Sequence, residues 1–232
     1  RAFGIDLPEG HDERYAMAQE RTDYVKKVWT KERFDWDGTY YQGENILGIP
    51  GLYYEDEIVP IFNAGTSKQG RDFGAKNADF VFTNVFGPED GAEVAADLKK
   101  QAMDDYGRKF GVLTPAHVVC RPTEKEAEEF LHYYADENAD WAAVDNLMNL
   151  QMKHAKSFTP EMLATYRSRF AAGHGSVPLY GTPDQVADEI ERYWKAGFGG
   201  LTLAFVDYIG ELEYFAAEVL PRLEKKGART PR

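Results

Sequence analysis

Short apolar runs alternate with segments of helical periodicity along most of the chain, and this alternation constrains the fold more than any other feature. The runs at 58–63, 80–85, 110–120 and 200–207 are typical of short buried strands, and helical segments follow them. Strands that alternate with helices form parallel βα units, so we predict an α/β fold. A closed (β/α)8 barrel needs eight strands in about 250 residues, and this sequence holds about half of one.

Helix and turn signals predict the other elements. We expect a short hairpin at 36–42 around Asp37-Gly38 and helices at 11–30, 70–77, 91–106, from Thr123, across 136–172, from Thr182 to Gly197 and at 209–225. The first helix should bury one face, on which Tyr15, Ala18, Thr22, Val25, Val28 and Trp29 recur at helical spacing. No low-complexity linker and no internal repeat marks a boundary, so residues 1–232 are predicted to form one domain.

Length and composition exclude several classes of protein. The 232 residues can bury a sizeable core, and 14 Tyr, 14 Phe and 4 Trp are far more than a disordered chain carries. No stretch approaches the roughly 18 apolar residues of a membrane span. The chain begins with Arg1, which is neither a signal peptide nor a tag, so we expect the N-terminal part of a longer domain to be missing.

Charge and cysteine content restrict the partners. The net charge of −12 disfavours nucleic acid, although a local pocket can still be positive and bind a small anion. Cys120 is the single cysteine, which excludes a disulfide framework or a cysteine-based metal site within one chain. A reducing cytoplasm fits this composition, and we predict no metal.

The best candidate site is the segment 60–77, where a strand runs through a glycine-rich loop into a helix. Gly65 and Gly70 permit close backbone approach, and the free N–H groups of the helix start together with Ser67 can bind a phosphate. Lys68 or Arg71 can add positive charge. An ordinary capped helix, with Ser67 as the cap and nothing bound, explains the pattern about equally well.

Two known catalytic or phosphate-binding motifs, the nucleophile elbow and the P-loop, do not match the segment 65–70. Gly65 and Gly70 lie one residue too far apart for a nucleophile elbow, which makes a serine hydrolase improbable. The pattern is not a P-loop either, because no Ser or Thr follows the lysine after a second glycine.

The histidines differ in their surroundings. His174 lies between glycines in a loop before Val177, and loops carry functional residues more often than cores do, so we select it as the candidate catalytic histidine. His117 lies in an apolar strand and is interpreted as a core residue, whereas His132 and His154 lie on charged helices and are interpreted as solvated. His11 begins the charged segment 11–15, which suits a helix start and makes a weak metal site.

Three further groups have ordinary structural interpretations. The aromatic residues Trp36, Tyr40, Tyr41, Tyr53 and Tyr54 are expected to pack rather than to form a ligand cage. Cys120 is expected to be a small core residue, and the acidic run 124–129 a solvated helix face.

Seven segments of the chain follow one another in a recognisable order and spacing: His11–Tyr15, Val28-Trp29, Phe34–Tyr41, Asn63–Ser67 with Gly70, Ala78-Asp79, Gly181–Ala187 and Val219–Leu223. In these segments the chain resembles the bacterial-luciferase-like flavin monooxygenases, in the neighbourhood of the pyrimidine oxygenases and dimethyl-sulfide monooxygenases. The resemblance implies a (β/α)8 TIM barrel of the luciferase-like type. It places this chain in the second half, with strands five to eight and a helical insertion at 136–176 before the last barrel unit.

The resemblance also implies a cofactor and a reaction. FMN, supplied as FMNH2 by a separate NAD(P)H:flavin reductase, would react with O2 to a C4a-peroxyflavin that oxygenates a small organic substrate. Arg14 and Tyr15 match the family's pair near the FMN phosphate, and Ser67 matches its phosphate-binding serine, in agreement with the predicted pocket at Gly65 and Gly70. The complete protein would be a homo-oligomer. Alternatives are a non-catalytic flavin-binding relative, an F420-dependent oxidoreductase, or a barrel aldolase or isomerase without flavin.

Overall fold

A computed structural model of the chain describes residues 8–30, 32–52, 59–151 and 159–231. The chain divides into two compact units. The first consists of Arg1–Val81 and Gln101–Phe110, and the second of Phe82–Lys100 and Gly111–Arg232.

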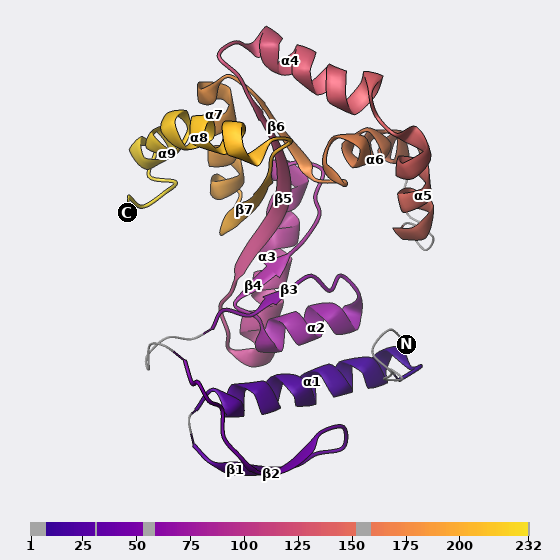
Figure 1. The fold of residues 1–232 in the computed structure, drawn as a ribbon, viewed down its shortest axis with the longest axis vertical. Helices are drawn as coiled ribbons and strands as arrows, with labels where there is room; N and C mark the ends of the chain where they lie inside the picture. Colours follow the sequence, from indigo (N-terminus) through magenta and orange to yellow (C-terminus); the bar gives the residue numbers. More distant parts are fainter. Residues whose placement is uncertain (1–7, 31, 53–58, 152–158, 232) are drawn as a thin grey trace. The chain divides into compact units, whose positions relative to one another are not determined.

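The first unit combines a long helix, a hairpin and one βαβ unit (Figure 1). Its elements in chain order are α1 (His11–Val28), β1 (Phe34–Asp37), β2 (Gln42–Ile46), β3 (Phe62–Asn63), α2 (Lys68–Asn77) and β4 (Phe80–Phe82). β3 and β4 are parallel, with Phe62 opposite Phe80 and Asn63 opposite Val81. The predicted parallel βα arrangement is therefore confirmed for this part of the chain.

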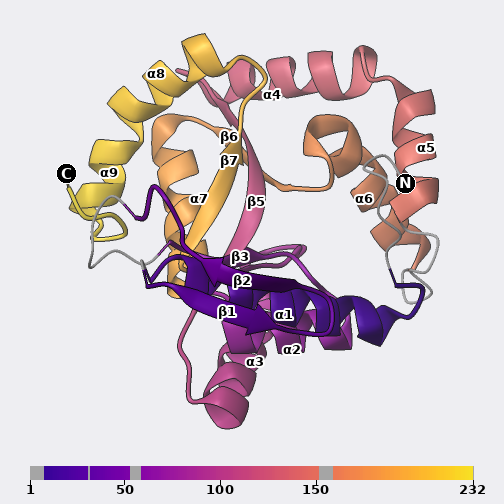
Figure 2. The same cartoon turned by 60° about the horizontal axis from the view of Figure 1, so that its bottom comes forward.

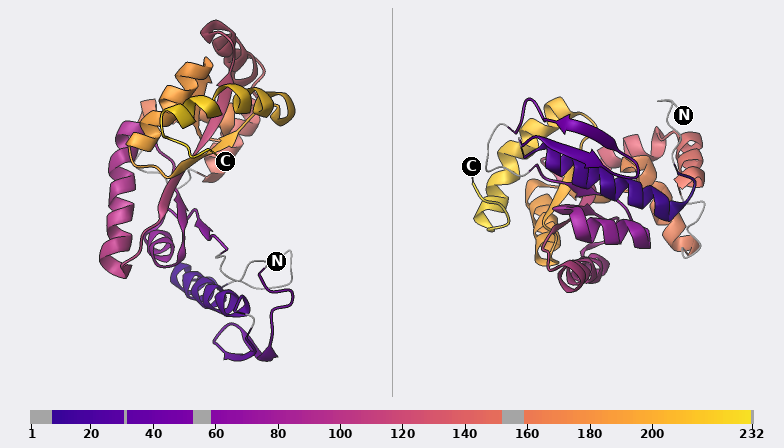
Figure 3. Two further views of the ribbon diagram at one scale, coloured as in Figure 1. Left: turned by 90° about the vertical axis from the view of Figure 1, so that its left-hand side faces the viewer. Right: turned by 90° about the horizontal axis from the view of Figure 1, so that it is seen from below.

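The predicted hairpin is present and lies along α1 (Figures 1 and 3). β1 and β2 are antiparallel, with Asp37 opposite Gln42, so Gly38 and the next three residues make the turn. Tyr24 of α1 contacts the rings of Phe34, Trp36 and Tyr41, at 5.9, 5.6 and 6.0 Å between ring centroids. Packing of Trp36 and Tyr41 is thus confirmed, whereas Tyr53 and Tyr54 lie outside the described residues.

The second unit is organised around the long strand β5 (Gly111–Cys120) (Figure 2). Two parallel strands flank it, β6 (Val177–Gly181) and β7 (Gly200–Ala204). Residue His117 of β5 lies opposite Pro178 of β6 and Ala204 of β7. Val112, Ala116, Val118 and Val119 of this strand are almost completely buried, which places the core of the unit here.

Helices surround these strands. In chain order they are α3 (Pro88–Tyr106), which ends in the first unit, α4 (Glu124–His132), the π-helix η1 (Tyr133–Glu137), α5 (Trp141–Gln151), α6 (Pro160–Gly173), α7 (Pro183–Lys195), α8 (Tyr208–Glu218) and α9 (Leu220–Lys225). Thr123 and Thr182 cap α4 and α7, as the sequence indicates, and each cap is part of a capping box, with Glu126 and Gln185 respectively. The described residues of the predicted helical region 136–172 form helices and no strand, as predicted, but residues 138–140 interrupt it between η1 and α5.

Four details differ from the predictions. The short strand β6 lies outside the four predicted strand runs, and its Pro178 pairs with β5. The last helix is divided, because Pro221 lacks the N–H that would continue α8 into α9. Phe62 is 53% exposed, and its side chain lines an open hollow instead of a closed core. Ile58 lies outside the described residues. α1 has no fully buried residue.

None of the helices within the described ranges combines the length and the apolar character needed to cross a bilayer.

Candidate functional site

The loop between β3 and α2 is shaped by two short polar contacts. The Asn63 side-chain oxygen accepts a hydrogen bond from the Gly65 amide at 3.0 Å, and the Ser67 hydroxyl accepts one from the Gly70 amide at 3.1 Å. Ser67 has an extended backbone and caps α2, which begins at Lys68, two residues before the predicted start. The capping role foreseen for Ser67 is therefore confirmed, and the hydroxyl proton remains available to donate to a ligand.

The start of α2 has the features of an anion site. The amides of Lys68 and Gln69 occupy the first helical positions, where no intrahelical acceptor is available and the helix dipole is positive. Lys68 and Arg71 are both exposed and lie in the same turn. The loop can thus offer amides, a hydroxyl and positive charge to a phosphate group.

The hydroxyl of Tyr15 reaches this loop from α1. A Cβ atom added to Gly70 would lie 2.7 Å from Tyr15 Oη, and one added to Gly65 would lie 2.9 Å from it. The same Cβ on Gly65 would be 2.7 Å from the Gly70 Cα, so the two glycines permit a backbone approach that larger residues would prevent. Within the described part of the chain, Tyr15 Oη has no hydrogen-bond partner. The structure therefore brings together Tyr15, Gly65, Ser67 and Gly70.

Polar contacts between α1 and α2 hold Tyr15 in this place. The Gln69 amide donates to Asp12 at 2.8 Å, at the start of α1. About two turns further along α1, the side-chain amides of Gln19 and Asn77 exchange two hydrogen bonds of 2.7 and 3.1 Å. The Tyr15 ring lies between these contacts, with its centroid 5.8 Å from that of Phe73.

Arg14 makes different contacts from those of Tyr15. Its guanidinium donates to the carbonyl oxygens of Glu9 at 2.6 Å and Pro8 at 3.2 Å. It also lines a hollow of about 370 Å³ with His11, Tyr15 and Ala18. Both protein contacts of the guanidinium therefore lie on the segment before α1, and its predicted role beside the phosphate stays a prediction.

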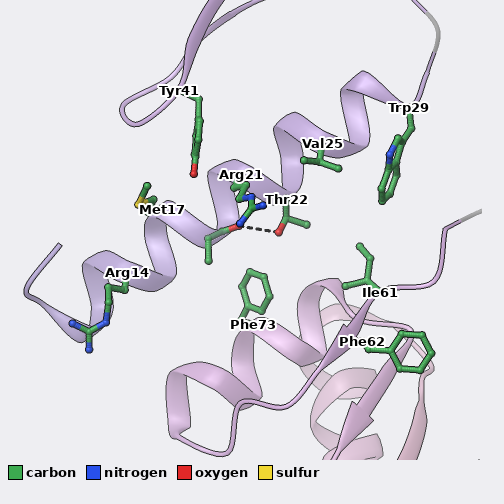
Figure 4. Close-up of a pocket in the computed structure, with 11 residues that line it drawn as sticks. Arg14, Met17, Arg21, Thr22, Val25, Trp29, Tyr41, Ile61, Phe62 and Phe73 are labelled. Atoms are coloured by element: carbon green, nitrogen blue, oxygen red, sulfur yellow. Dashed lines mark hydrogen bonds between the residues drawn. The ribbon is translucent and has the colours of Figure 1, made fainter. Parts of the chain in front are cut away.

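A larger cavity of about 580 Å³ lies along α1 (Figure 4). Its lining comes from α1, the hairpin, the β3 segment and α2: Arg14, Met17, Ala18, Arg21, Thr22, Val25, Trp29, Tyr41, Ile61, Phe62 and Phe73. The predicted apolar face of α1 thus lines a cavity instead of a closed core. Arg21, which sequence reasoning passed over, lies seven residues after Arg14, and this helical spacing was the signal that could have placed both arginines on one face.

His174 belongs to the second unit. It ends α6 in the left-handed conformation, with φ 55° and ψ 39°, and its side chain is exposed. Its Nε2 lies 3.0 Å from the Gln151 side-chain nitrogen, and its ring lies 5.1 Å from that of Phe170. The predicted loop position is confirmed, the left-handed conformation ends α6, and the catalytic role of His174 stays a prediction.

The remaining candidates have structural roles. His117 is a buried, hydrogen-bonded core residue, and burial raises the pKa of the Cys120 thiol to about 11, both in line with the structural interpretation. His132 is exposed between two carboxylates, as expected of a solvated histidine, whereas His154 lies outside the described residues. Across the described ranges, no group of three or more His, Cys, Asp or Glu residues is placed to hold a metal ion.

Comparison with known proteins decides the family. The sequence model described as Luciferase-like monooxygenase matches residues 1–199. The chain belongs to this luciferase-like family. The resemblance drawn from the motifs is therefore confirmed.

Individual relatives agree with this assignment. An FMNH2-dependent dimethylsulfone monooxygenase of Pseudomonas fluorescens (strain Pf0-1) is 30% identical over 226 residues, which are 94% of this chain and 60% of the relative. A dimethyl-sulfide monooxygenase of Hyphomicrobium sulfonivorans is 28% identical, over 97% of this chain and 57% of the relative. The chain thus spans about 60% of the length of its curated luciferase-like relatives.

Solved structures establish the fold. A riboflavin lyase, crystallised with modified FMN and riboflavin, superposes with a TM-score of 0.79 at 22% identity. The match covers 99% of this chain and 61% of the lyase chain. The luciferase-like chain therefore has the α/β fold of part of the family's TIM barrel, as predicted.

Proposed function

We propose that the chain is the phosphate-binding part of an FMN-dependent monooxygenase that uses FMNH2 and O2 to oxygenate a small organic substrate. The proposal rests on one observation: the Tyr15 hydroxyl lies against Gly65 and Gly70, beside the start of α2 that Ser67 caps. A flavin phosphate needs such a set of hydroxyl and amide donors in a space free of side chains. The FMNH2 dependence of its Pseudomonas fluorescens relative supports this choice of cofactor.

The residues of the loop fit a phosphate group. Ser67 Oγ accepts the Gly70 amide and can direct its own proton to a phosphate oxygen, and Tyr15 Oη can donate a second proton from α1. The first amides of α2 and the exposed Lys68 and Arg71 supply further donors and charge. When bound, reduced FMN supplies the electrons and activates O2, and the protein positions the flavin and excludes water.

Other residues and partners complete the proposal. His174 is proposed to hydrogen-bond the substrate. Its imidazole is exposed, and its left-handed backbone conformation costs free energy to keep. Arg14 is retained as a second phosphate ligand on the family resemblance alone. A separate NAD(P)H:flavin reductase, a cytoplasmic location and assembly into a homo-oligomer are further parts of the proposal for the complete protein.

Flavin titration of two Ser67 variants tests the assignment. Ser67→Asp keeps an excellent helix cap but places a negative charge against a phosphate, whereas Ser67→Ala removes the cap as well. We expect Ser67→Asp to weaken the binding of FMN by at least about tenfold. The affinity for riboflavin, which has no phosphate, should stay within about twofold of that of the wild type. Thr159→Asp is the matched control, because Thr159 caps α6 in the same way.

The outcomes separate the alternatives. Equal losses for FMN and riboflavin would refute the phosphate assignment. Flavin bound without O2 consumption would indicate a non-catalytic flavin-binding relative, and preference for F420 would indicate a deazaflavin-dependent oxidoreductase. No flavin binding by the folded complete protein would favour a barrel aldolase or isomerase. Tighter binding of anaerobically reduced FMN than of oxidised FMN would support a monooxygenase that receives its flavin from a reductase.

A further inference from the structure

His117 is a buried titratable group for which the proposed function has no use. It lies in the middle of β5, only 4% exposed, and its cross-strand neighbours Pro178 and Ala204 have no polar side chain. Burial and the positive charge of Arg169 lower the pKa of His117 to about 4, although contact with the Ser176 backbone raises it in part. The imidazole is therefore neutral at physiological pH.

The position of its single proton follows from the contacts of Ser176. Ser176 Oγ lies 2.6 Å from the carbonyl oxygen of Gly173 and 2.9 Å from Nδ1 of His117. A carbonyl oxygen can only accept, so the one hydroxyl proton of Ser176 is donated to Gly173. Nδ1 of His117 must then carry the imidazole proton and donate it to Ser176 Oγ. The result is a directed chain of hydrogen bonds from β5 to the end of α6.

This chain of hydrogen bonds ends one residue before His174. A Cβ atom on Gly173 would lie 2.6 Å from both His117 Cβ and Ser176 Oγ, so the backbone of the loop is pressed against the histidine. Gly175, on the other side of His174, has φ 83° and closes the turn through its amide, which donates to the Arg169 carbonyl at 3.0 Å. His174 thus has its strained conformation between two glycines whose positions are set by contacts with β5 and α6.

We propose that His117 is a positioning residue, which acts through Ser176 and Gly173 to hold His174 in its left-handed conformation and so to present the His174 imidazole to the substrate. The inference rests on the proposed monooxygenase function for the role of His174. The geometry of the hydrogen-bond chain is independent of that function, so its test begins without flavin.

Histidine NMR of the flavin-free chain provides the first test. We expect the His117 resonances to show an Nδ1-protonated neutral ring that does not titrate between about pH 8 and pH 5. Ser176→Ala removes one oxygen atom and should shift and broaden the His174 signals toward those of an unconstrained histidine. His117→Asn keeps a donor near the Nδ1 position and should preserve the His174 signals, whereas His117→Leu should not. An Nε2-protonated ring, or unchanged His174 signals in Ser176→Ala, would overturn the proposal.

A double-mutant cycle provides the second test, with the rate at which added dimethylsulfone, the substrate in the name of the Pseudomonas relative, is oxygenated in the presence of reduced FMN and O2 as the readout. Ser176→Ala is expected to lower this rate about tenfold in the wild-type background and less than about twofold in the His174→Ala background. Equal effects in both backgrounds would mean that Ser176 and His117 act on stability or elsewhere, and would contradict the inference. His132→Asn is the matched control for the loss of a histidine outside the loop. If reduced FMN does not bind, the proposed function fails, and the NMR test still decides the role of His117.

Discussion

The carboxylate of Glu20 accepts the backbone amide of Tyr41 at 2.8 Å and joins the middle of α1 to the turn of the hairpin. The amides of Thr39 and Tyr40 donate to the same carboxylate at 3.0 Å, and the Trp36 indole nitrogen lies 3.4 Å from it. A Cβ atom on Gly38 would lie 2.0 Å from Glu20 Oε1, so the turn closes directly over the carboxylate. One acidic side chain therefore satisfies successive backbone donors of the turn.

Loss of the Glu20 charge should loosen the hairpin. Partial burial tends to raise the pKa of Glu20, but hydrogen bonds from Tyr41, Tyr40, Trp36 and Thr39 outweigh it and hold the pKa below the ordinary 4.5. A lowered pKa means that the stabilisation is present above pH 4.5 and is lost as the pH falls through the folded value. We expect Glu20→Gln to lower the free energy of unfolding at pH 7 and to differ less from wild type at acid pH. Urea unfolding at both pH values measures this, with Glu128→Gln on α4 as a control of equal charge change.

Gly70→Ala should destabilise the protein even though alanine favours helices. Propensity alone would give a gain of roughly 0.5–1 kcal/mol, but the added Cβ would lie 2.7 Å from Tyr15 Oη and 2.8 Å from the Gly65 Cα. We expect a net loss of about 1–3 kcal/mol, as for other overpacked sites, together with weaker FMN binding. Thermal unfolding and flavin titration measure the two effects. Gly210→Ala, at the same third position of α8 and with its Cβ meeting only the flexible Asp207 carboxylate at 3.3 Å, should be neutral or slightly stabilising, and an equal loss there would contradict the steric explanation.

The buried His117 should make stability depend on pH. Because its pKa falls from 6.5 to about 4 on folding, the unfolded chain binds more protons in this range. Stability is then complete above pH 6.5 and is lost as the pH falls from 6.5 toward 4, by an amount of the order of 3 kcal/mol. His117→Asn should remove this part of the dependence, which urea unfolding at a series of pH values would detect. Parallel curves for the variant and the wild type would show that His117 is not buried in its neutral form.

His132 should titrate in the opposite direction. A hydrogen bond to Asp136 is the main cause that raises its pKa above 6.5, slight burial opposes it, and Glu137 adds to the increase. The π-helix η1 places both carboxylates within 3.3 Å of the ring. A raised pKa means that the stabilisation is present below pH 6.5 and is lost as the pH rises through the folded value. An NMR titration should show a lower His132 pKa in Asp136→Asn than in the wild type. Glu129 pairs with Lys125, so the control variant Glu129→Gln should change the His132 pKa less.

Local chemistry explains which elements could be predicted. Ser67, Thr123 and Thr182 cap the helices that follow them, because a cap requires only a side chain and an amide three residues later. The buried strand β5 is recognisable from a continuous apolar run. β6 was missed because five residues that include a proline carry little strand signal of their own, and the strand β5 with which they pair lies about 60 residues away in the chain. Pro178 is tolerated because β6 is the last strand in the order of its sheet.

The sequence by itself determined the family, the βα alternation and the capped loop at Ser67, because periodicity, caps and ordered motifs are properties of neighbouring residues. Only the tertiary structure decided that Tyr15 and not Arg14 contacts Gly65 and Gly70, that Glu20 closes the hairpin turn, and that Ser176 joins His117 to the His174 loop. These contacts join residues between about 20 and 60 positions apart. Their formation depends on how whole elements pack, and packing is a property of surfaces and not of local sequence.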